Sequence, residues 1–425
     1  MKKLLFCIFL FLVILAVFLS ACGIRQAATP AESPAEELSA QEESPAEETP
    51  APTPTPTPVV DLTFPDGSIH PSDAASLQLL TLTHDDVAKT LPLLKQMTGL
   101  VYLDLGSETA DVPAADGVSA EQQPRDLSWD DIRAIQEACP NVGVRYAFTL
   151  WGKSFTTLDT KMDLNHIKMN DEGAAVREVL PCMTNCKVLD MDFCGVDSEH
   201  MAEIRNAYPD MDVIWRIWFG NDCSVRTDTE RILASNLNHV LTDANTKDLK
   251  YCTKIRLLDV GHNGGLTDFN FLREMPDLEV LIVSLCGFSD FTVLENCKNL
   301  EFFEFCSYWQ GYDVGPLGDL TNLEHVNICG LGKITGWERL ENLKKLQRLW
   351  IGQYTILPEG AIEELQAALP DTEINITEKT GCLGTWREAA DGSFVPRYEK
   401  LREQFQYDDY PHVCSSWFND PKYYG

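Results

Sequence analysis

The most regular feature of the chain is an apolar pattern between Leu249 and Ile351 that returns every 22 or 23 residues. The pattern is L-x-x-L-x-x-L-x-x-L-x-L, and its third apolar position falls at Ile255, Leu278, Leu300, Leu323 and Leu346. A constant period of this length is typical of repeat proteins, in which each unit buries its apolar side only against its neighbours. Each unit is therefore predicted to add one short strand to a parallel sheet and a helix or loop to the outer wall.

The same unit extends toward the N-terminus. Segments 94–105 and 180–191 fit the pattern, and Leu80 with Leu82 lie 23 residues before Leu103 and Leu105. A second kind of turn, in which a helical segment runs into Ala-x-Pro and then a strand, occurs at 131–152, 199–220 and 361–381. Its prolines, at 140, 209 and 370, are separated by three and seven times 23 residues. The pattern predicts an α/β solenoid of about 13 turns over residues 60–381, with a parallel sheet on the concave face.

The two ends of the chain do not repeat. Residues 1–21 have the lysines, short apolar run and small-residue ending of a signal peptide, and they are followed by Cys22. Residues 22–59 are rich in Pro, Glu, Ala and Thr and predict a disordered tether. The aromatic-rich residues 382–425 lie beyond the last repeat. A solenoid exposes an apolar end, so we expect them to form a C-terminal cap.

Charge and motifs exclude several functions. The formal net charge of −31 at pH 7 argues against nucleic acid and anionic membrane surfaces as partners, because both would repel the chain. The sequence contains no C-x-x-C pair and no H-E-x-x-H motif, so it predicts neither a metal site nor a cofactor. Its histidines do not occur in a recognisable catalytic signature, and we expect no catalytic residue.

The repeats resemble a known family. The units from Leu249 to Ile351, with Thr267-Asp268, Ser289-Asp290 and Thr335-Gly336 between strand and outer segment, look like the short leucine-rich repeats of internalins. The ending Leu19-Ser20-Ala21-Cys22 resembles the bacterial lipoprotein cleavage box, in which the cysteine becomes lipidated. Together with the Ala-x-Pro turns, it makes the chain similar to leucine-rich repeat lipoproteins of gut Gram-positive bacteria. The resemblance implies a recognition protein that its lipid holds at the outer face of the bacterial membrane.

The cysteines have a structural interpretation in such a repeat. The repeats of the family that this chain resembles have a ladder of Asn or Cys side chains, which hydrogen-bond to the buried backbone of the loops. Cys194 and Cys286 fall at this position of the repeat, and Asn263 occupies the same position in its own unit. Cys182 with Cys186, or Cys382 with Cys414, are candidate disulfides. Sequence alone does not assign their connectivity.

Strand alternation also predicts which side chains lie on the concave face. From Val280 onward these side chains are mainly apolar and aromatic, and Tyr308, Trp309 and Tyr354 adjoin them in loops. Clustered aromatic residues with an arginine are typical of binding surfaces. The alternative is that several of them pack beneath loops or the C-terminal segment. The predicted ligand-binding residues are Val280, Ile282, Phe302, Glu304, Tyr308, Trp309, His325, Asn327, Arg348, Trp350 and Tyr354.

The earlier strands carry acids on the same face. Asp190, Asp192 and Asp259 can be solvated charges, calcium ligands or the acids of a glycosidase. The preferred hypothesis is a lipid-anchored surface protein that binds a protein or glycan through the concave face. The alternative is an extracytoplasmic enzyme that acts on cell-wall or host polysaccharide.

Overall fold

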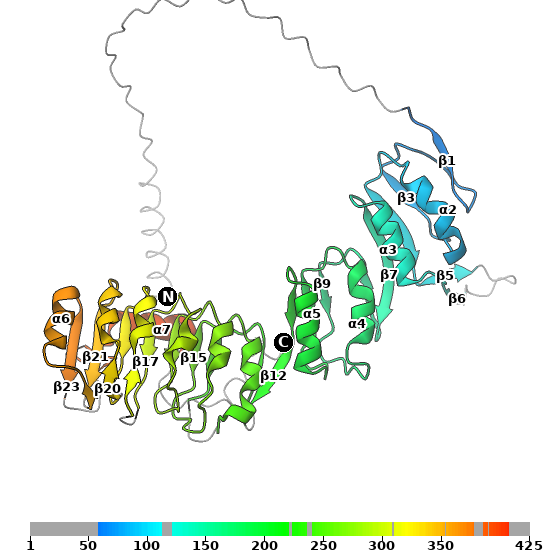
Figure 1. Ribbon diagram of the computed structural model, residues 1–425. Coiled ribbons are helices and arrows are strands. Elements are labelled where there is room, and N and C mark those ends of the chain that lie inside the picture. The colour runs from blue at the N-terminus through cyan, green and yellow to red at the C-terminus, as the bar shows by residue number, and fades with distance from the viewer. Residues whose placement is uncertain are drawn as a thin grey trace, which may run out of the picture. The chain divides into compact units, whose positions relative to one another are not determined.

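The computed structural model describes residues 58–112, 121–220, 223–235, 240–307, 310–352, 354–377, 386–389 and 391–407. The chain divides into two units, Met1–Pro58 and Val59–Gly425, and the second contains the repeats (Figure 1). The predicted signal peptide, Cys22 and most of the predicted tether lie outside the described residues. Within the described ranges, no helix combines the length and the apolar character needed to cross a membrane.

The N-terminal block, residues 76–156, contains a four-stranded sheet in the order β3-β4-β7-β8. Its strands are β3 (Ser76–Gln78), β4 (Tyr102–Ser107), β7 (Gly143–Leu150) and β8 (Lys153–Thr156), and its helices are α2 (His84–Leu94) and α3 (Trp129–Ala138). Two small hairpins adjoin it, β1 (Asp61–Thr63) with β2 (Ile69–Pro71) and β5 (Thr109–Val112) with β6 (Glu121–Pro124). Leu77 pairs with Leu103, so placing Leu80 and Leu82 in the first strand was wrong. The 11-residue helix α2 needs a unit longer than 23 residues.

The middle block, residues 161–226, has three parallel strands, β9 (Lys161–Asp163), β10 (Val188–Asp190) and β11 (Asp212–Ile214). Its outer wall consists of α4 (Ala174–Val179), the 3-10 helix η1 (Leu180–Cys182) and α5 (Ser198–Ala207). The chain then forms an antiparallel hairpin of β12 (Arg216–Phe219) and β13 (Cys223–Arg226).

The C-terminal block, residues 231–377, contains a seven-stranded parallel sheet in the order β14-β15-β16-β17-β19-β21-β23. Pairing joins Leu257, Val280, Phe302, His325 and Arg348 across adjacent strands, which confirms the predicted 22- and 23-residue period. The strands are β14 (Arg231–Leu233), β15 (Leu257–Asp259), β16 (Val280–Ile282), β17 (Phe302–Glu304), β19 (His325–Asn327), β21 (Arg348–Gly352) and β23 (Glu373–Thr377).

Short 3-10 helices form the outer wall of this block, because a 22-residue unit leaves no room for a long helix (Figure 1). They are η2 (Asp243–Asn245), η3 (Lys247–Tyr251), η4 (Asn270–Glu274), η5 (Phe291–Leu294), η6 (Gly315–Asp319) and η7 (Trp337–Asn342), followed by α6 (Ala361–Ala368). The strands β18 (Tyr312–Asp313), β20 (Gly332–Thr335) and β22 (Thr355–Ile356) form a separate small sheet. The parallel sheets and mixed α/β content fit a leucine-rich repeat fold.

The Ala-x-Pro turns have the structure that the sequence predicts. Helices α3, α5 and α6 end at Ala138, Ala207 and Ala368, two residues before the proline, and a strand begins three residues after it. Proline lacks the N–H that a helix needs, so the helix stops there. Each of these strands, β7, β11 and β23, is the last parallel strand of its sheet. The strands that these turns lead into therefore belong to three separate sheets, one in each block. A continuous coil of about 13 turns remains a prediction.

The buried cysteines confirm the predicted ladder. The Cys286 thiol donates to the carbonyl oxygen of Val260 at 3.0 Å, and Asn263 donates to the same oxygen at 2.8 Å. Burial raises the pKa of Cys286 to about 12, so the sulfur keeps the proton that it donates. Cys182 and Cys186 are both free thiols, so their candidate disulfide was wrong. Cys223 and Cys306 are disulfide-bonded, and the candidate pair Cys382 and Cys414 lies outside the described residues.

Candidate functional site: the concave face of the C-terminal block

The predicted ligand-binding residues on β16, β17, β19 and β21 lie on neighbouring strands and share one face. Pairing places Phe302 beside His325 and Glu304 beside Asn327, so their side chains form adjacent columns. The side chains of this group are buried, with exposed fractions of 6% or less; they belong to Val280, Ile282, Phe302, Glu304, His325, Asn327, Arg348 and Trp350. Tyr354 is 44% exposed, whereas Tyr308 and Trp309 lie outside the described residues.

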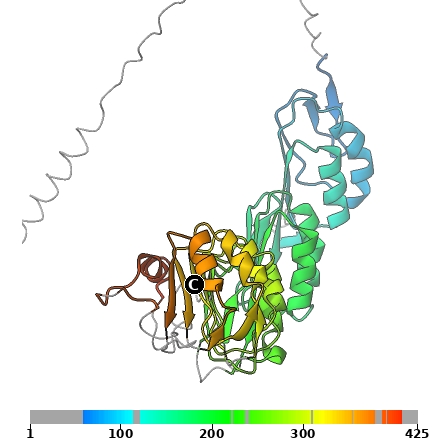
Figure 2. The ribbon, with the colours of Figure 1, turned by 60° about the vertical axis from the view of Figure 1, so that its left-hand side comes forward.

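Residues 386–389 and 391–407, here called the covering segment, lie over this face. The segment includes α7 (Pro396–Phe405), which lies on the side of the sheet opposite α6 (Figure 2). Of the two arrangements that the sequence left open, the structure shows packing beneath the C-terminal segment. The sequence predicted that residues 382–425 cap the end of the repeats. Their described part covers the concave face and not an end of the sheet. The segment lies there because its aromatic and basic side chains complement the aromatic and acidic side chains of this face.

An aromatic cluster joins the segment to the sheet. The ring of Phe302 lies 5.0 Å from that of Trp386 and 6.2 Å from that of Tyr398, between centroids. His325 stacks on Phe302 with an interplanar angle of 15° and lies 6.1 Å from Trp386. The side chains of Trp386 and Tyr398 are fully buried. Aromatic burial of this extent makes a large contribution to packing.

Glu304 is the polar centre of the face. Its Oε2 accepts hydrogen bonds from the indole Nε1 of Trp386 at 2.6 Å and from Nη2 and Nε of Arg387 at 2.8 and 3.0 Å. Both Glu304 and Trp386 are buried. A carboxylate removed from water needs such partners, because burying an unpaired charge is costly. On β15, Asp259 accepts a hydrogen bond of 2.9 Å from the Tyr407 hydroxyl in the same way.

A row of glutamates lies along one edge of the sheet, each directly before the first residue of a strand, and binds one side of α7. Arg397 lies 2.9 Å from Glu301, Lys400 lies 3.1 Å from the same carboxylate, and Gln404 donates to Glu279 at 3.1 Å. Helical residues rise about 1.5 Å each and strands are about 4.8 Å apart, so three or four residues of α7 span one strand. The helix therefore runs across the strands with its basic side on the acidic row.

His325 is held neutral beneath the segment. Burial lowers its pKa, and the positive charges of Arg348 and Arg397 lower it further, to about 3. Its Nδ1 atom is buried and makes no hydrogen bond among the described residues. Arg348 also fixes the segment, because its Nη1 donates to the carbonyl oxygen of Trp386 at 2.5 Å. The imidazole and the guanidinium are thus both part of the covered interface.

The acids of the earlier strands are paired within the repeats. Asp192 accepts two hydrogen bonds of 2.8 Å from Arg216, and Asp190 accepts bonds of 3.1 and 3.2 Å from Arg226. Such two-pronged pairs occupy the carboxylate oxygens that a calcium ion or a substrate would need. In the part of the chain that the structure describes, no group of three or more His, Cys, Asp or Glu side chains is placed to hold a metal.

Sequence reasoning missed the residues that cover the face, Trp386, Arg387, Tyr398 and Tyr407. It noted the excess of aromatic residues in 382–425 but assigned them to the end of the repeats. A usable signal was present, because Glu279, Glu301 and Glu324 recur at the repeat period. The pair Arg397 and Lys400, three residues apart in a helical pattern, supplies the complementary charges.

No protein-family model matches the sequence, and neither does any curated protein. Among solved structures, the chain is similar to an internalin (inlF) of Listeria monocytogenes, with a TM-score of 0.26 and 16% identity over 43% of this chain and 55% of that one. Internalin C2 (inlC2) of the same species gives a TM-score of 0.25 and 14% identity over 62% and 82%. A leucine-rich repeat protein of Leptospira interrogans gives 0.22 and 12% over 69% and 100%. The structural neighbours are thus internalins and other leucine-rich repeat proteins.

Proposed function

We propose that the protein is a lipid-anchored surface recognition protein that binds a protein or glycan partner through the concave face of its repeats. Lipidated Cys22 holds it at the outer face of the bacterial membrane, and residues 22–59 act as the tether. At about 3.1 Å per residue, an extended tether of this length reaches about 100 Å. The repeats then lie well away from the bilayer.

The observation that supports the proposal is the way the face already binds the covering segment. Phe302 and His325 hold aromatic rings, Glu304 holds an indole N–H and a guanidinium, and the glutamate row holds basic side chains. A partner that presents aromatic and basic groups fits the same positions once the segment is displaced. The covering segment thus acts as an intramolecular occupant of the proposed site.

The test uses a partner recovered with the full-length protein from mucus or cell wall, and then measures its binding directly. The double variant Phe302→Ala, Trp350→Ala should abolish binding, whereas Trp151→Ala, outside this face, should leave it unchanged. A free peptide with the sequence of residues 386–407 should compete with the partner. Unchanged binding by a folded double variant, together with no competition by the peptide, would place the site elsewhere.

The alternative, an enzyme acting on cell-wall or host polysaccharide, depends on available acids on the concave face. Asp190 is paired with Arg226, and Asp259 accepts from Tyr407. No observation on the described residues favours the enzyme, so we retain recognition as the proposed function. Turnover of a glycan panel that is lost in Asp190→Asn and Asp259→Asn would reverse this choice.

A further inference from the structure

The side of α7 that meets the sheet is both apolar and basic. Arg397 and Lys400 lie 2.9 and 3.1 Å from the carboxylate of Glu301. Beside them, an apolar stripe with the spacing of one helix face is buried against the sheet. The stripe consists of Tyr398, Leu401 and Phe405. The occupant of this part of the concave face is therefore a basic amphipathic helix.

The glutamate row is suited to a helix in this orientation. Glu279, Glu301 and Glu324 precede three neighbouring strands and are 22 and 23 residues apart. Because strands are about 4.8 Å apart, the row is about 10 Å long, which is about two turns of a helix. All three glutamates are half-buried, so a cation that meets them is partly shielded from water. The row therefore favours a helix with basic residues three or four positions apart.

The pairing between α7 and this face is incomplete. Arg397 is 3% exposed and lies near Glu301 and, at 3.6 Å, near Glu324. None of its three guanidinium nitrogens donates a hydrogen bond within the described part of the chain, and Nδ1 of His325 also makes none there. Buried polar groups without hydrogen bonds weaken an interface. The other end of the covering segment gives Glu304 three hydrogen bonds, so α7 is the less well paired part.

We infer that the partner of the concave face is a protein that presents a basic amphipathic helix, which replaces α7 on the glutamate row. This inference rests on the proposed function and selects a protein over a glycan. The hydroxyl groups of an uncharged glycan bring no cation to the half-buried carboxylates, whereas arginine and lysine side chains do. The net charge of −31 also attracts a cationic partner.

Peptide binding to the full chain, followed by fluorescence anisotropy, tests the inference. One labelled peptide, the basic peptide, has the sequence of residues 394–407, and the reversed peptide carries Arg397→Glu and Lys400→Glu. The same two substitutions in the full chain repel its own α7 from Glu301 and free the row. The basic peptide should bind this charge-reversed chain at least tenfold more tightly than it binds the wild type. The reversed peptide should bind the charge-reversed chain at least tenfold more weakly than the basic peptide does.

A further substitution on the sheet tests the same contact from the other side. Adding Glu301→Lys to the charge-reversed chain restores the attraction between the sheet and α7, so the basic peptide should lose its binding. Equal affinity of the two peptides for the charge-reversed chain would overturn the inference. So would the absence of binding by the basic peptide while circular dichroism shows that the charge-reversed chain is folded.

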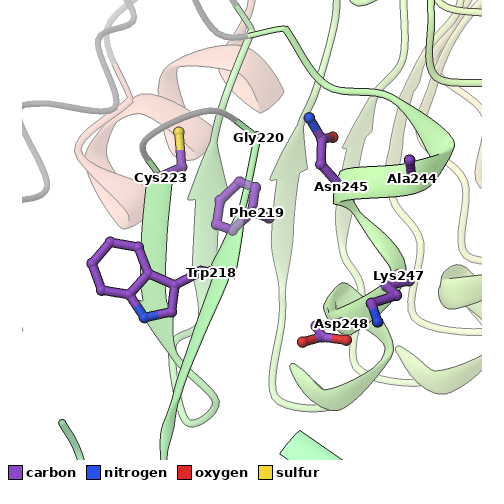
Figure 3. A pocket seen from close by; sticks show the side chains of 8 residues that line it. All are labelled: Trp218, Phe219, Gly220, Cys223, Ala244, Asn245, Lys247 and Asp248. Carbon is purple, nitrogen blue, oxygen red and sulfur yellow. The ribbon is translucent and has the colours of Figure 1, made fainter. Parts of the chain in front are cut away.

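The matched control is Trp218→Ala in the charge-reversed chain. Trp218 is 59% exposed and lines a cavity between the β12–β13 hairpin and η2–η3, to which neither the covering segment nor the glutamate row contributes (Figure 3). Its indole points away from Lys247 and Asp248, across β12 (Figure 3). Removing this exposed ring should leave the affinity for the basic peptide unchanged.

The partner recovered with the full-length protein separates this inference from the proposed function. Its binding should be lost in Phe302→Ala, Trp350→Ala and should be competed by the basic peptide. Loss of binding in the double variant without competition by the basic peptide would overturn the inference of a helix and leave the proposed concave site standing.

Discussion

The middle and C-terminal blocks both carry buried acids on the concave face, but their cationic partners come from different parts of the chain. Asp192 is paired with Arg216, 24 residues away on the following hairpin. Glu304 is paired with Arg387, 83 residues away in the covering segment. The concave face of the middle block is therefore completed by the hairpin that directly follows its own sheet. That of the C-terminal block is completed only when a segment outside the repeats folds onto it.

The largest expected difference between the two regions follows from Trp386→Ala. Removing this fully buried indole should lower the free energy of unfolding by about 3–5 kcal/mol, as measured by urea denaturation. It should also accelerate limited proteolysis within residues 391–407. The control Trp218→Ala removes an exposed indole and should change stability by less than about 0.5 kcal/mol. Equal stability and equal proteolysis of the two variants would contradict a covering role for Trp386.

A smaller effect should separate the two buried acids. Glu304→Gln and Asp192→Asn each keep the shape of the side chain but remove its charge, and each should cost about 1–3 kcal/mol. Only Glu304→Gln should speed proteolysis of the covering segment, because only Glu304 binds that segment. Faster cleavage of the covering segment in Asp192→Asn would show that the two faces are coupled and not independent.

The effect that is smallest near neutral pH is a pH dependence confined to the covered face. Folding lowers the pKa of His325 from 6.5 to about 3, so between these values the unfolded chain binds a proton that the folded chain excludes. Stability should therefore fall as the pH decreases through this window and level off below about 3. A single group contributes at most about 1.4 kcal/mol per pH unit.

The measurement compares urea denaturation of the wild type and His325→Phe at several pH values. The phenylalanine keeps a ring against Phe302 and Trp386 but does not titrate, so the acid-induced loss of stability should be shallower in the variant. Identical slopes would mean that other groups, such as the glutamates around α7, account for the whole pH dependence.

The strands of the C-terminal block were predictable, because the positions of Leu258, Leu281 and Phe303 follow from a local apolar period. The Ala-x-Pro turns were equally local, since proline ends a helix wherever it occurs. The first strand was misplaced at Leu80 because a constant 23-residue unit was applied to it. The first unit is longer, since it contains helix α2, and the length of that helix depends on packing and not on the period.

The covering segment was harder to predict. Its contacts join residues about a hundred positions apart, such as Lys400 and Glu301, and a repeat pattern does not encode which distant stretch will occupy its face. The exposure of a residue such as Phe302 therefore could not be decided from alternation alone. Complementary charges on the two segments were the one signal that sequence reasoning could have used.

The position of the Ala-x-Pro turns at the end of each sheet also has an evolutionary consequence. The middle block, residues 161–226, holds one complete sheet, β9-β10-β11, with its own closing hairpin of β12 and β13. A duplication or deletion of such a segment adds or removes a finished module and creates no new unpaired strand inside a sheet. Relatives of this chain are therefore expected to differ in length by whole modules.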